Sequence, residues 1–376
     1  MNVEAGTARI LTEAKRVAAI LHNCPEGSLA EHKTTAIIKD WCQRFNVPLL
    51  DLGLETGAVA FLDAGAARTV AFRADIDAVT LDIGIRHLCG HDYHTATLLG
   101  ALAVLSEQRS ELPHNVLFIF QPAEENTKGA RLILESGLFD RLSPKPFRLF
   151  GIHNRPEMPV GQVGVRQGAL MAEKSNFTVI FTGRGGHGGT PELCVDPIVA
   201  AAAFITGVQS IISRNASPFL PAVCSVCSIR SGSEQNYAPE VAVMTGSIRT
   251  LDHALHERIA DRVRGLATDT AAAFECACEV DMVREVPAVF NSSEMTAAAR
   301  EAAVATVGKA NVVSPDPCLG SEDFALLGEA IPSFFYWVGS GDKSKQNAAW
   351  HSEQFEVADG YLDIAIPLLV HAALTD

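Results

Sequence analysis

The stretch Leu88-Cys89-Gly90-His91-Asp92-Tyr93-His94 gathers a thiol, two imidazoles and a carboxylate around one glycine, directly before the helix-like run 95–105. Cys89 and His91 are two residues apart, which in a regular helix would point them to different faces. In a loop bent at Gly90, both side chains could turn toward one ion. A thiolate and a neutral imidazole are ligands that a zinc-like divalent cation prefers. The stretch therefore indicates either a metal site or a capped helix start with a buried cysteine.

The composition is that of an ordinary globular protein. Its 376 residues are 48% hydrophobic and 20% charged, enough for a sizeable core and two domains. The formal net charge of -14 argues against nucleic acid as a partner, because phosphate binding needs a basic surface. No apolar run approaches the length that spans a bilayer, and the first residues lack the pattern of a signal peptide. We therefore expect neither a nucleic-acid nor a membrane partner.

The cysteines do not indicate a disulfide framework. Nine of them, an odd number, are spread over a long chain, which favours a reducing, cytoplasmic location. Cys224 and Cys227 have the spacing of a redox or zinc pair, but they lie within the strand-like run 223–229. A thioredoxin-type pair would need a turn and a following helix, so we interpret both as sheet or core thiols.

The first part of the chain alternates apolar runs with helix-like segments. The run 116–120 is wholly apolar, which is typical of a parallel strand covered on both faces. This alternation predicts an α/β fold: a mostly parallel sheet flanked by helices, formed by residues 1–170 and 285–376. In such sheets, ligands bind beyond the carboxyl ends of the strands. The polar residues that follow the expected strands are Asp75, Glu124, Glu125 and His153.

The order of the expected strands and helices changes between residues 171 and 284. Strand-like and helix-like segments follow one another there in the order β-α-β-β-α-β, which is that of a ferredoxin-like domain. Asp196 is expected to cap the first of its helices, with Pro197 in the first helical position. We therefore predict a second domain inserted into the first.

The polar groups at strand ends suffice for two adjacent divalent ions. Possible ligands and one spare carboxylate are supplied by Cys89, His91, Glu124, Glu125, His153 and, in a late loop, His351. A spare carboxylate beside two ions is what metal-assisted hydrolysis requires. The ions lower the pKa of a water and polarise a carbonyl, while the carboxylate takes the proton of the water and delivers it to the leaving amine.

Short motifs in a fixed order along nearly the whole chain support this hypothesis. They are His22-Asn23-Cys24-Pro25-Glu26, Arg73-Ala74-Asp75-Ile76-Asp77, Cys89-Gly90-His91-Asp92, Gln121-Pro122-Ala123-Glu124-Glu125, Gly151-Ile152-His153, Gly185-Gly186-His187 with Asp196-Pro197, Gly320-Ser321-Glu322-Asp323-Phe324 and Trp350-His351-Ser352. In these motifs the sequence resembles the dinuclear-metal aminoacylase and carboxypeptidase superfamily. Within it, the sequence is most similar to the branch of indole-acetyl-amino-acid hydrolases, hippurate hydrolases and N-acetyl-diaminopimelate deacetylases.

The resemblance implies a role for each candidate residue of the catalytic domain. Cys89 would be the ligand shared by both ions, and Glu124 the general acid/base. Asp75 would stand behind a metal-binding histidine and orient it. The remaining ligands would be His91, Glu125, His153 and His351.

The resemblance also implies roles for the inserted domain, which in this family acts as a lid and often pairs two subunits. His187 matches a residue that reaches an active site and stabilises the oxyanion. Asn236 matches a lid asparagine near the substrate. Each could instead be a simple loop or turn residue. A homodimer through residues 171–284 is the expected assembly.

The expected activity is that of a metal-dependent amidohydrolase acting on small N-acyl amino acids. Zinc or manganese would serve as the ions, and cobalt or nickel are compatible with the same ligands. A dipeptidase or exopeptidase using the same site is the alternative within the fold. A non-catalytic binding protein would normally have lost a ligand or the base. A thiol hydrolase with Cys89 as nucleophile and His91 as base would leave the other candidate ligands unexplained.

Three departures from the family pattern bear on the substrate. The connection between Asp77 and Cys89 is short, Tyr93 adds bulk beside the ligands, and Glu173-Lys174-Ser175 replaces the usual small and acidic residues at the lid entrance. His94 is expected to be a structural hydrogen-bonding group rather than a further ligand. These departures leave the acyl group and the amino acid open.

Overall fold

The computed structural model describes residues 2–82 and 84–375, and the chain divides into two compact units. The first comprises Met1–Leu170, Phe290–Asp316 and Asp323–Asp376, and the second comprises Met171–Val289 and Pro317–Glu322. The sequence analysis placed the insertion at 171–284. It did not predict that the later segment 317–322 also belongs to the second unit.

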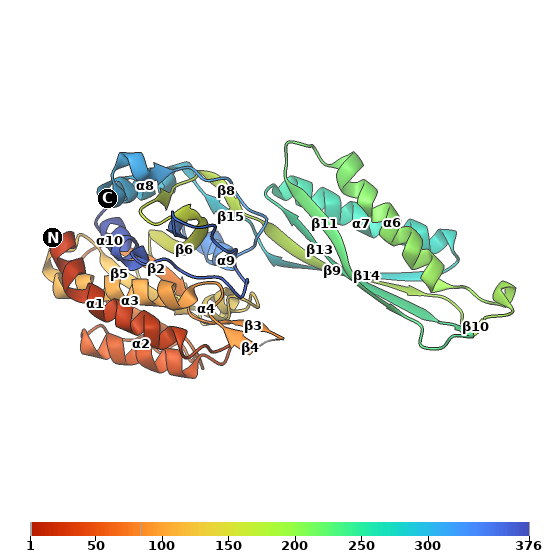
Figure 1. The fold of residues 1–376 in the computed structure, drawn as a ribbon, viewed down its shortest axis with the longest axis horizontal. Helices are drawn as coiled ribbons and strands as arrows, with labels where there is room; N and C mark the ends of the chain where they lie inside the picture. Colours follow the sequence, from red (N-terminus) through yellow and green to blue (C-terminus); the bar gives the residue numbers. More distant parts are fainter. Residues whose placement is uncertain (1, 83, 376) are drawn as a thin grey trace. The chain divides into compact units, whose positions relative to one another are not determined.

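A seven-stranded sheet forms the middle of the first unit (Figure 1). Its strands are ordered β1 (Ala58–Leu62), β5 (Asn115–Gln121), β2 (Thr69–Asp75), β6 (Arg148–Pro159), β17 (Ser333–Gly341), β7 (Val163–Gly164) and β16 (Val312–Val313). The central strands β5, β2, β6 and β17 run parallel, whereas β1 and β7 each pair antiparallel with a neighbour. The predicted α/β fold with a mostly parallel sheet is confirmed.

Helices cover the sheet and explain its continuous apolar runs. The helices α1 (Val3–His22), α3 (His91–Glu107), α8 (Ser293–Val307) and α10 (Tyr361–Leu374) contribute to the main core. Successive side chains of a strand point to opposite faces, and Phe334 and Tyr336 of β17 belong to that core. Phe335 between them instead contacts Phe324 of α9 (Phe324–Ala330), with ring centroids 4.8 Å apart. Both faces of β17 are therefore apolar.

The second unit has the predicted ferredoxin-like order. Its elements are β9 (Glu173–Thr182), α6 (Pro197–Asn215), β11 (Ala222–Ser231), β13 (Val241–Thr250), α7 (His253–Ala273) and β14 (Ala277–Val286). The strands form one antiparallel sheet in the order β11-β13-β9-β14, on which α6 and α7 complete a separate core (Figure 1). Asp196 caps α6 by accepting a hydrogen bond from the backbone N–H of Ile198 at 2.8 Å, and Pro197 follows it, as predicted.

By length and composition, α6 is apolar enough to cross a membrane. The sequence analysis had found no such run, because the apolar residues of α6 are interrupted by small and polar ones. Buried residues of α6, among them Phe204 and Val208, lie in the core of the second unit. The core helix of a globular domain meets the same criterion.

Two local features were not expected from the sequence. The strand expected to end before His153 continues to Pro159, because its outer half pairs in register with β17; His153 lies opposite Trp337. The short connection before Cys89 contains the hairpin of β3 (Val79–Leu81) and β4 (Gly84–Arg86), which the sequence analysis did not predict.

Candidate metal centre

The turn at Gly90 brings Cys89 and His91 into place at the start of α3. Gly90 adopts a left-handed conformation with φ 88°. A Cβ atom at this position would lie 2.4 Å from Nδ2 of Asn154, so only glycine fits. Asn154 Nδ2 also donates a hydrogen bond to the carbonyl of Cys89. The glycine and the asparagine together fix the bend that the sequence analysis required for a metal site.

The five predicted ligands converge from separate elements of the first unit. Cys89 Sγ lies 3.5 Å from Nε2 of His153. Glu125 Oε1 lies 3.8 Å from Nε2 of His91 and 3.4 Å from Nε2 of His351. The potential ligand atoms of Cys89, Glu125 and His351 all lie within 4.8 Å of one another. The structure thus brings together every residue that the sequence analysis proposed as a ligand.

The donor atoms fit a pair of divalent cations. His91 Nε2 and Glu125 Oε1 are buried, and neither has a hydrogen-bond partner among the described residues. Such atoms cost free energy when buried unless another group satisfies them. Thiolate, imidazole and carboxylate are all ligands of divalent transition metals. An ion at this place would satisfy both atoms.

The charges of the cluster attract a cation. The neighbouring side chains of Cys89 and Glu125 stabilise the protonated ring of His351 and raise its pKa to about 10. Burial acts to lower the pKa of His91, but the charges of Asp75 and Cys89 outweigh it and leave that pKa well above its usual value. Burial holds the pKa of His153 well below its usual range, so this imidazole is neutral and can act as a ligand. In both raised cases the protein stabilises positive charge where an ion would lie.

Asp77 connects the proposed ligands to their surroundings. Nδ1 of His91 lies 3.0 Å from the carbonyl of Asp77 and 3.3 Å from its carboxylate. The other carboxylate oxygen accepts hydrogen bonds from Ser28 Oγ at 2.7 Å and from the backbone N–H of Glu125 at 3.1 Å. Burial acts to raise the pKa of Asp77, but the hydrogen bonds leave it lowered and the group ionised. The sequence analysis missed this role, although Asp77 belongs to one of its motifs.

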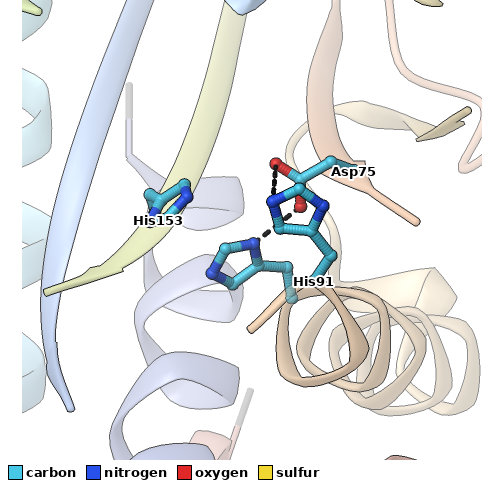
Figure 2. Close-up of side chains that lie close together, drawn as sticks. Asp75, His91 and His153 are labelled. Atoms are coloured by element: carbon cyan, nitrogen blue, oxygen red, sulfur yellow. Dashed lines mark hydrogen bonds and ion pairs between the residues drawn. The ribbon is translucent and has the colours of Figure 1, made fainter. Parts of the chain in front are cut away.

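Of the two neighbouring histidines, Asp75 forms a hydrogen bond with His94 and not with His91. Its Oδ1 lies 2.6 Å from Nδ1 of His94, whereas its Oδ2 lies 3.8 Å from Nε2 of His91. Figure 2 shows Asp75, His91 and His153 approaching one another from a strand end, a helix start and a second strand. Nε2 of His94 accepts a hydrogen bond from the backbone N–H of Asn154 at 2.9 Å, so both ring nitrogens are engaged. Both nitrogens of His94 thus have protein partners, in keeping with its expected structural role; that role and the role of Asp75 behind a ligand remain predictions.

A fully buried arginine lies behind Asp75. Arg73 donates to Asp75 at 2.8 Å, to Asp323 at 3.0 Å and to Gln121 at 2.9 Å. Asp323 also accepts a hydrogen bond from the backbone N–H of Ala130 at 2.9 Å. Burial raises the pKa of Asp323 to about 6, against the effect of Arg73. These pairs fix the strand end that carries Asp75.

Glu124, the predicted general acid/base, is buried beside the ligands. It follows Ala123, whose φ of 57° lies in the left-handed region that a non-glycine residue rarely adopts. The backbone N–H of Ala123 donates to the buried carboxylate of Glu31 at 2.8 Å, which supports this strained turn. A carboxylate oxygen of Glu124 lies within 4.8 Å of potential ligand atoms of His91 and Glu125. The turn thus places two adjacent glutamates at one centre.

His187 and Asn236 lie in the second unit. The short strands β10 (Gly186–His187) and β12 (Tyr237–Ala238) pair antiparallel, and the backbone N–H of Gly188 donates to the carbonyl of Asn236 at 2.9 Å. Both side chains are exposed. Nδ1 of His187 accepts a hydrogen bond from the backbone N–H of Gly189 at 3.0 Å. The structure brings these two residues together, and their catalytic roles remain predictions.

The comparison with known proteins agrees with this geometry. A sequence profile of peptidase family M20/M25/M40 matches residues 71–374. The chain belongs to this family. An N-acetylcysteine deacetylase from Bacillus subtilis is 37% identical over 358 residues, covering 92% of each chain. An IAA-amino acid hydrolase from Arabidopsis thaliana is 31% identical and covers 94% of this chain and 84% of the relative.

A solved structure extends the agreement to the fold. The crystal structure of a dinuclear metal-binding peptidase of the M20 family from Bacillus subtilis is 32% identical in sequence and covers 98% of each chain, with a TM-score of 0.83. The predicted resemblance and the prediction of a hydrolase are therefore confirmed. In the M20/M25/M40 chain described here, the candidate ligands gather near the carboxyl ends of β2 and β5, where an α/β fold binds its ligands, with His153 within β6 and His91 at the start of α3.

Proposed function

We propose that this M20/M25/M40 chain is a dinuclear-metal amidohydrolase that cleaves the amide bond of N-acyl amino acids. The observation that carries the proposal is the convergence of Cys89, His91, Glu125, His153 and His351, with Glu124 beside them. The relatives named for deacetylation of N-acetylcysteine and for hydrolysis of IAA-amino acids support the substrate class.

The residues of the chain divide the work between holding the ions and moving a proton. Bound ions would lower the pKa of a water and polarise the substrate carbonyl. Cys89 would be shared between the two ions, with zinc or manganese favoured and cobalt or nickel compatible. Glu124 takes a proton from the attacking water as the new carbon–oxygen bond forms. It returns that proton to the nitrogen as the carbon–nitrogen bond breaks, which releases a carboxylate and an amine.

The inserted unit would complete this chemistry. His187 would donate a hydrogen bond to the developing oxyanion, and Asn236 would lie near the substrate. Pairing of two subunits through the insertion would form a homodimer. We further propose that the enzyme works in the cytoplasm on small molecules, without a nucleic-acid or membrane partner. The acidic composition and the scattered cysteines support this assignment.

Substitution of the proposed base tests the assignment. Glu124→Gln should lower kcat on N-acyl amino acids by about 10²–10⁴-fold, because the proton transfer is lost, and should leave the bound metal unchanged. The exposed Glu353→Gln, in the loop next to His351, is a matched control and should keep full activity. Full activity of Glu124→Gln would refute the role of Glu124. Comparing kcat/KM for N-acyl amino acids and dipeptides separates the acylase from the peptidase alternative.

A further inference from the structure

The first unit has a polar cavity at the β7–β16 edge of its sheet, with a volume of about 570 Å³. Segment 165–167, which follows β7, the N-terminal half of α8, and Ser314, which follows β16, line it. Its polar side chains are those of Arg166, Gln167, Ser293, Thr296, Arg300 and Ser314. Of the described residues that line it, none is a candidate metal ligand. Volumes of about 300–1,000 Å³ are typical of sites for small organic ligands.

Backbone carbonyls, and not carboxylates, hold the two arginines of this cavity. Arg166 donates from Nε to the carbonyl of Ala169 at 3.3 Å and from Nη1 to that of Pro315 at 3.1 Å. Arg300 donates from Nη2 to the carbonyl of Val165 at 3.3 Å. Within the described part of the chain, neither arginine forms an ion pair. The carbonyls therefore fix the guanidinium groups without neutralising their charge.

The positive charge of the cavity contrasts with the rest of the chain, whose formal net charge is -14. The acidic residues next to its lining segments in the sequence are Glu294, Glu301 and Asp316, and none of these three lines it. Two positive charges on one cavity raise the local concentration of anions and favour an anion between them. The cavity therefore suits a negatively charged ligand.

The free donors of the cavity favour a phosphate over a carboxylate. A guanidinium is a planar fork of N–H donors that matches either anion. The carbonyl contacts leave Nη2 of Arg166, and Nε and Nη1 of Arg300, without a partner among the described residues. The side chains of Gln167, Ser293 and Ser314 add further donors. A carboxylate has two acceptor oxygens, whereas a phosphate monoester has three to meet these donors.

We propose that this cavity binds the phosphate group of a small, polar phosphomonoester, at a site separate from the metal centre. Arg166 and Arg300 would bind the phosphate through their free N–H groups. The space beyond the phosphate, with Val165 and Ala297 as its apolar lining, suits a polar organic part such as a polyol. The lining segments meet only in the folded chain, since Arg166 and Pro315 are 149 residues apart. Binding should therefore stabilise the folded protein.

Calorimetric titration of the metal-loaded protein tests the site, with inorganic phosphate, glycerol 3-phosphate and acetate as probes. We expect both phosphate probes to bind, glycerol 3-phosphate at least as tightly as inorganic phosphate, and acetate more weakly than either. Arg300→Gln should weaken the binding of both phosphate probes by about 10–100-fold, because a charge-assisted contact is lost. Binding of inorganic phosphate without glycerol 3-phosphate would overturn the assignment to a phosphomonoester.

Two further variants distinguish this cavity from phosphate bound at the metal centre. Ser293→Asp keeps both arginines and their carbonyl contacts, and it adds a carboxylate to the first turn of α8, where negative charge stabilises a helix. It should fold and lose phosphate binding. The exposed Arg258→Gln on α7 changes the net charge as Arg300→Gln does and should bind like the wild type.

Thermal unfolding and metal content confirm that each variant is intact. In the wild type, the phosphate probes should also raise the melting temperature, and Ser293→Asp should lack this rise. Equal phosphate affinity in the wild type, Arg300→Gln and Ser293→Asp would show that phosphate binds elsewhere and would overturn the proposal. The absence of phosphate binding by the wild type would overturn it as well.

Discussion

The candidate metal centre of the first unit and the β10–β12 pair of the second hold their candidate residues in opposite ways. At the metal centre, His91 at the start of α3 and Asp77 just beyond β2 are fully buried and joined by hydrogen bonds. On the β10–β12 pair, His187 is exposed, and its ring contacts only the neighbouring Gly189 among the hydrogen bonds of the described residues. The first arrangement fixes ligands before anything binds. The second leaves a side chain free to adjust to a substrate.

The largest effect should come from removing the shared ligand. Cys89→Ala should lose the bound ions, and its hydrolysis should fall to the background rate, because Cys89 is proposed to be a ligand of both ions. Metal analysis together with the activity assay checks this. The exposed Cys227→Ala should change neither quantity. If Cys89→Ala kept both ions, Cys89 would not be the shared ligand, and the claim that buried residues fix the metal centre would lose its main support.

The buried charges behind the ligands should dominate stability. Asp323→Asn removes one partner of the fully buried Arg73 and should lower the free energy of unfolding by about 3–5 kcal/mol. Glu13→Gln breaks a surface pair with Arg44 and should cost about 0–1 kcal/mol. Denaturant unfolding of both variants compares the two costs. Equal losses would show that the network around Arg73 does not hold the strand ends.

Loss of the exposed His187 should lower the turnover number and leave the metal content unchanged. His187→Ala should lower kcat by about 10²–10³-fold, the usual cost of a lost oxyanion donor, with metal content and stability unchanged. If His187 acts on the partner subunit, mixed dimers of inactive His187→Ala and inactive Cys89→Ala should regain part of the activity. A monomer in light scattering with full activity would contradict both the dimer and that role.

The smallest effect concerns acidification of the second unit. Burial lowers the pKa of His256, whose Nε2 lies 2.7 Å from Ser175 Oγ. The titratable and charged residues that act on it electrostatically are Glu173, Glu257, Arg284 and His253. The unfolded pKa of histidine is about 6.5. The stability that the neutral ring contributes is therefore complete above that pH and is lost as the pH falls through the lowered folded pKa. Between pH 7.5 and 5.5, the free energy of unfolding should fall more for the wild type than for His256→Gln, as measured by denaturant unfolding. An equal fall in the two proteins would refute this.

The apolar runs of the sequence predicted the parallel strands well, and with them the carboxyl ends of β2 and β5, near which Asp75, Glu124 and Glu125 lie. The buried ion pairs behind the candidate ligands could not be predicted from the sequence. Arg73 and Asp323 meet across 250 residues, and no local pattern encodes such a contact. The hairpin of β3 and β4 was missed because its strands are only three residues long each. The sequence analysis placed His153 just after a strand, whereas it lies within β6. The extension of β6 depends on its pairing with β17, and the local sequence does not encode that tertiary contact.

Counting metal ions in the active enzyme tests the central claim most directly. The purified protein is analysed for metal, stripped with a chelator and reconstituted, and its hydrolysis of an N-acyl amino acid is followed at each stage. The proposed centre predicts about two divalent ions per chain, loss of activity on chelation and recovery on adding metal back. Full activity of the metal-free protein, abolished instead by alkylation of Cys89, would contradict the claim and indicate a thiol hydrolase.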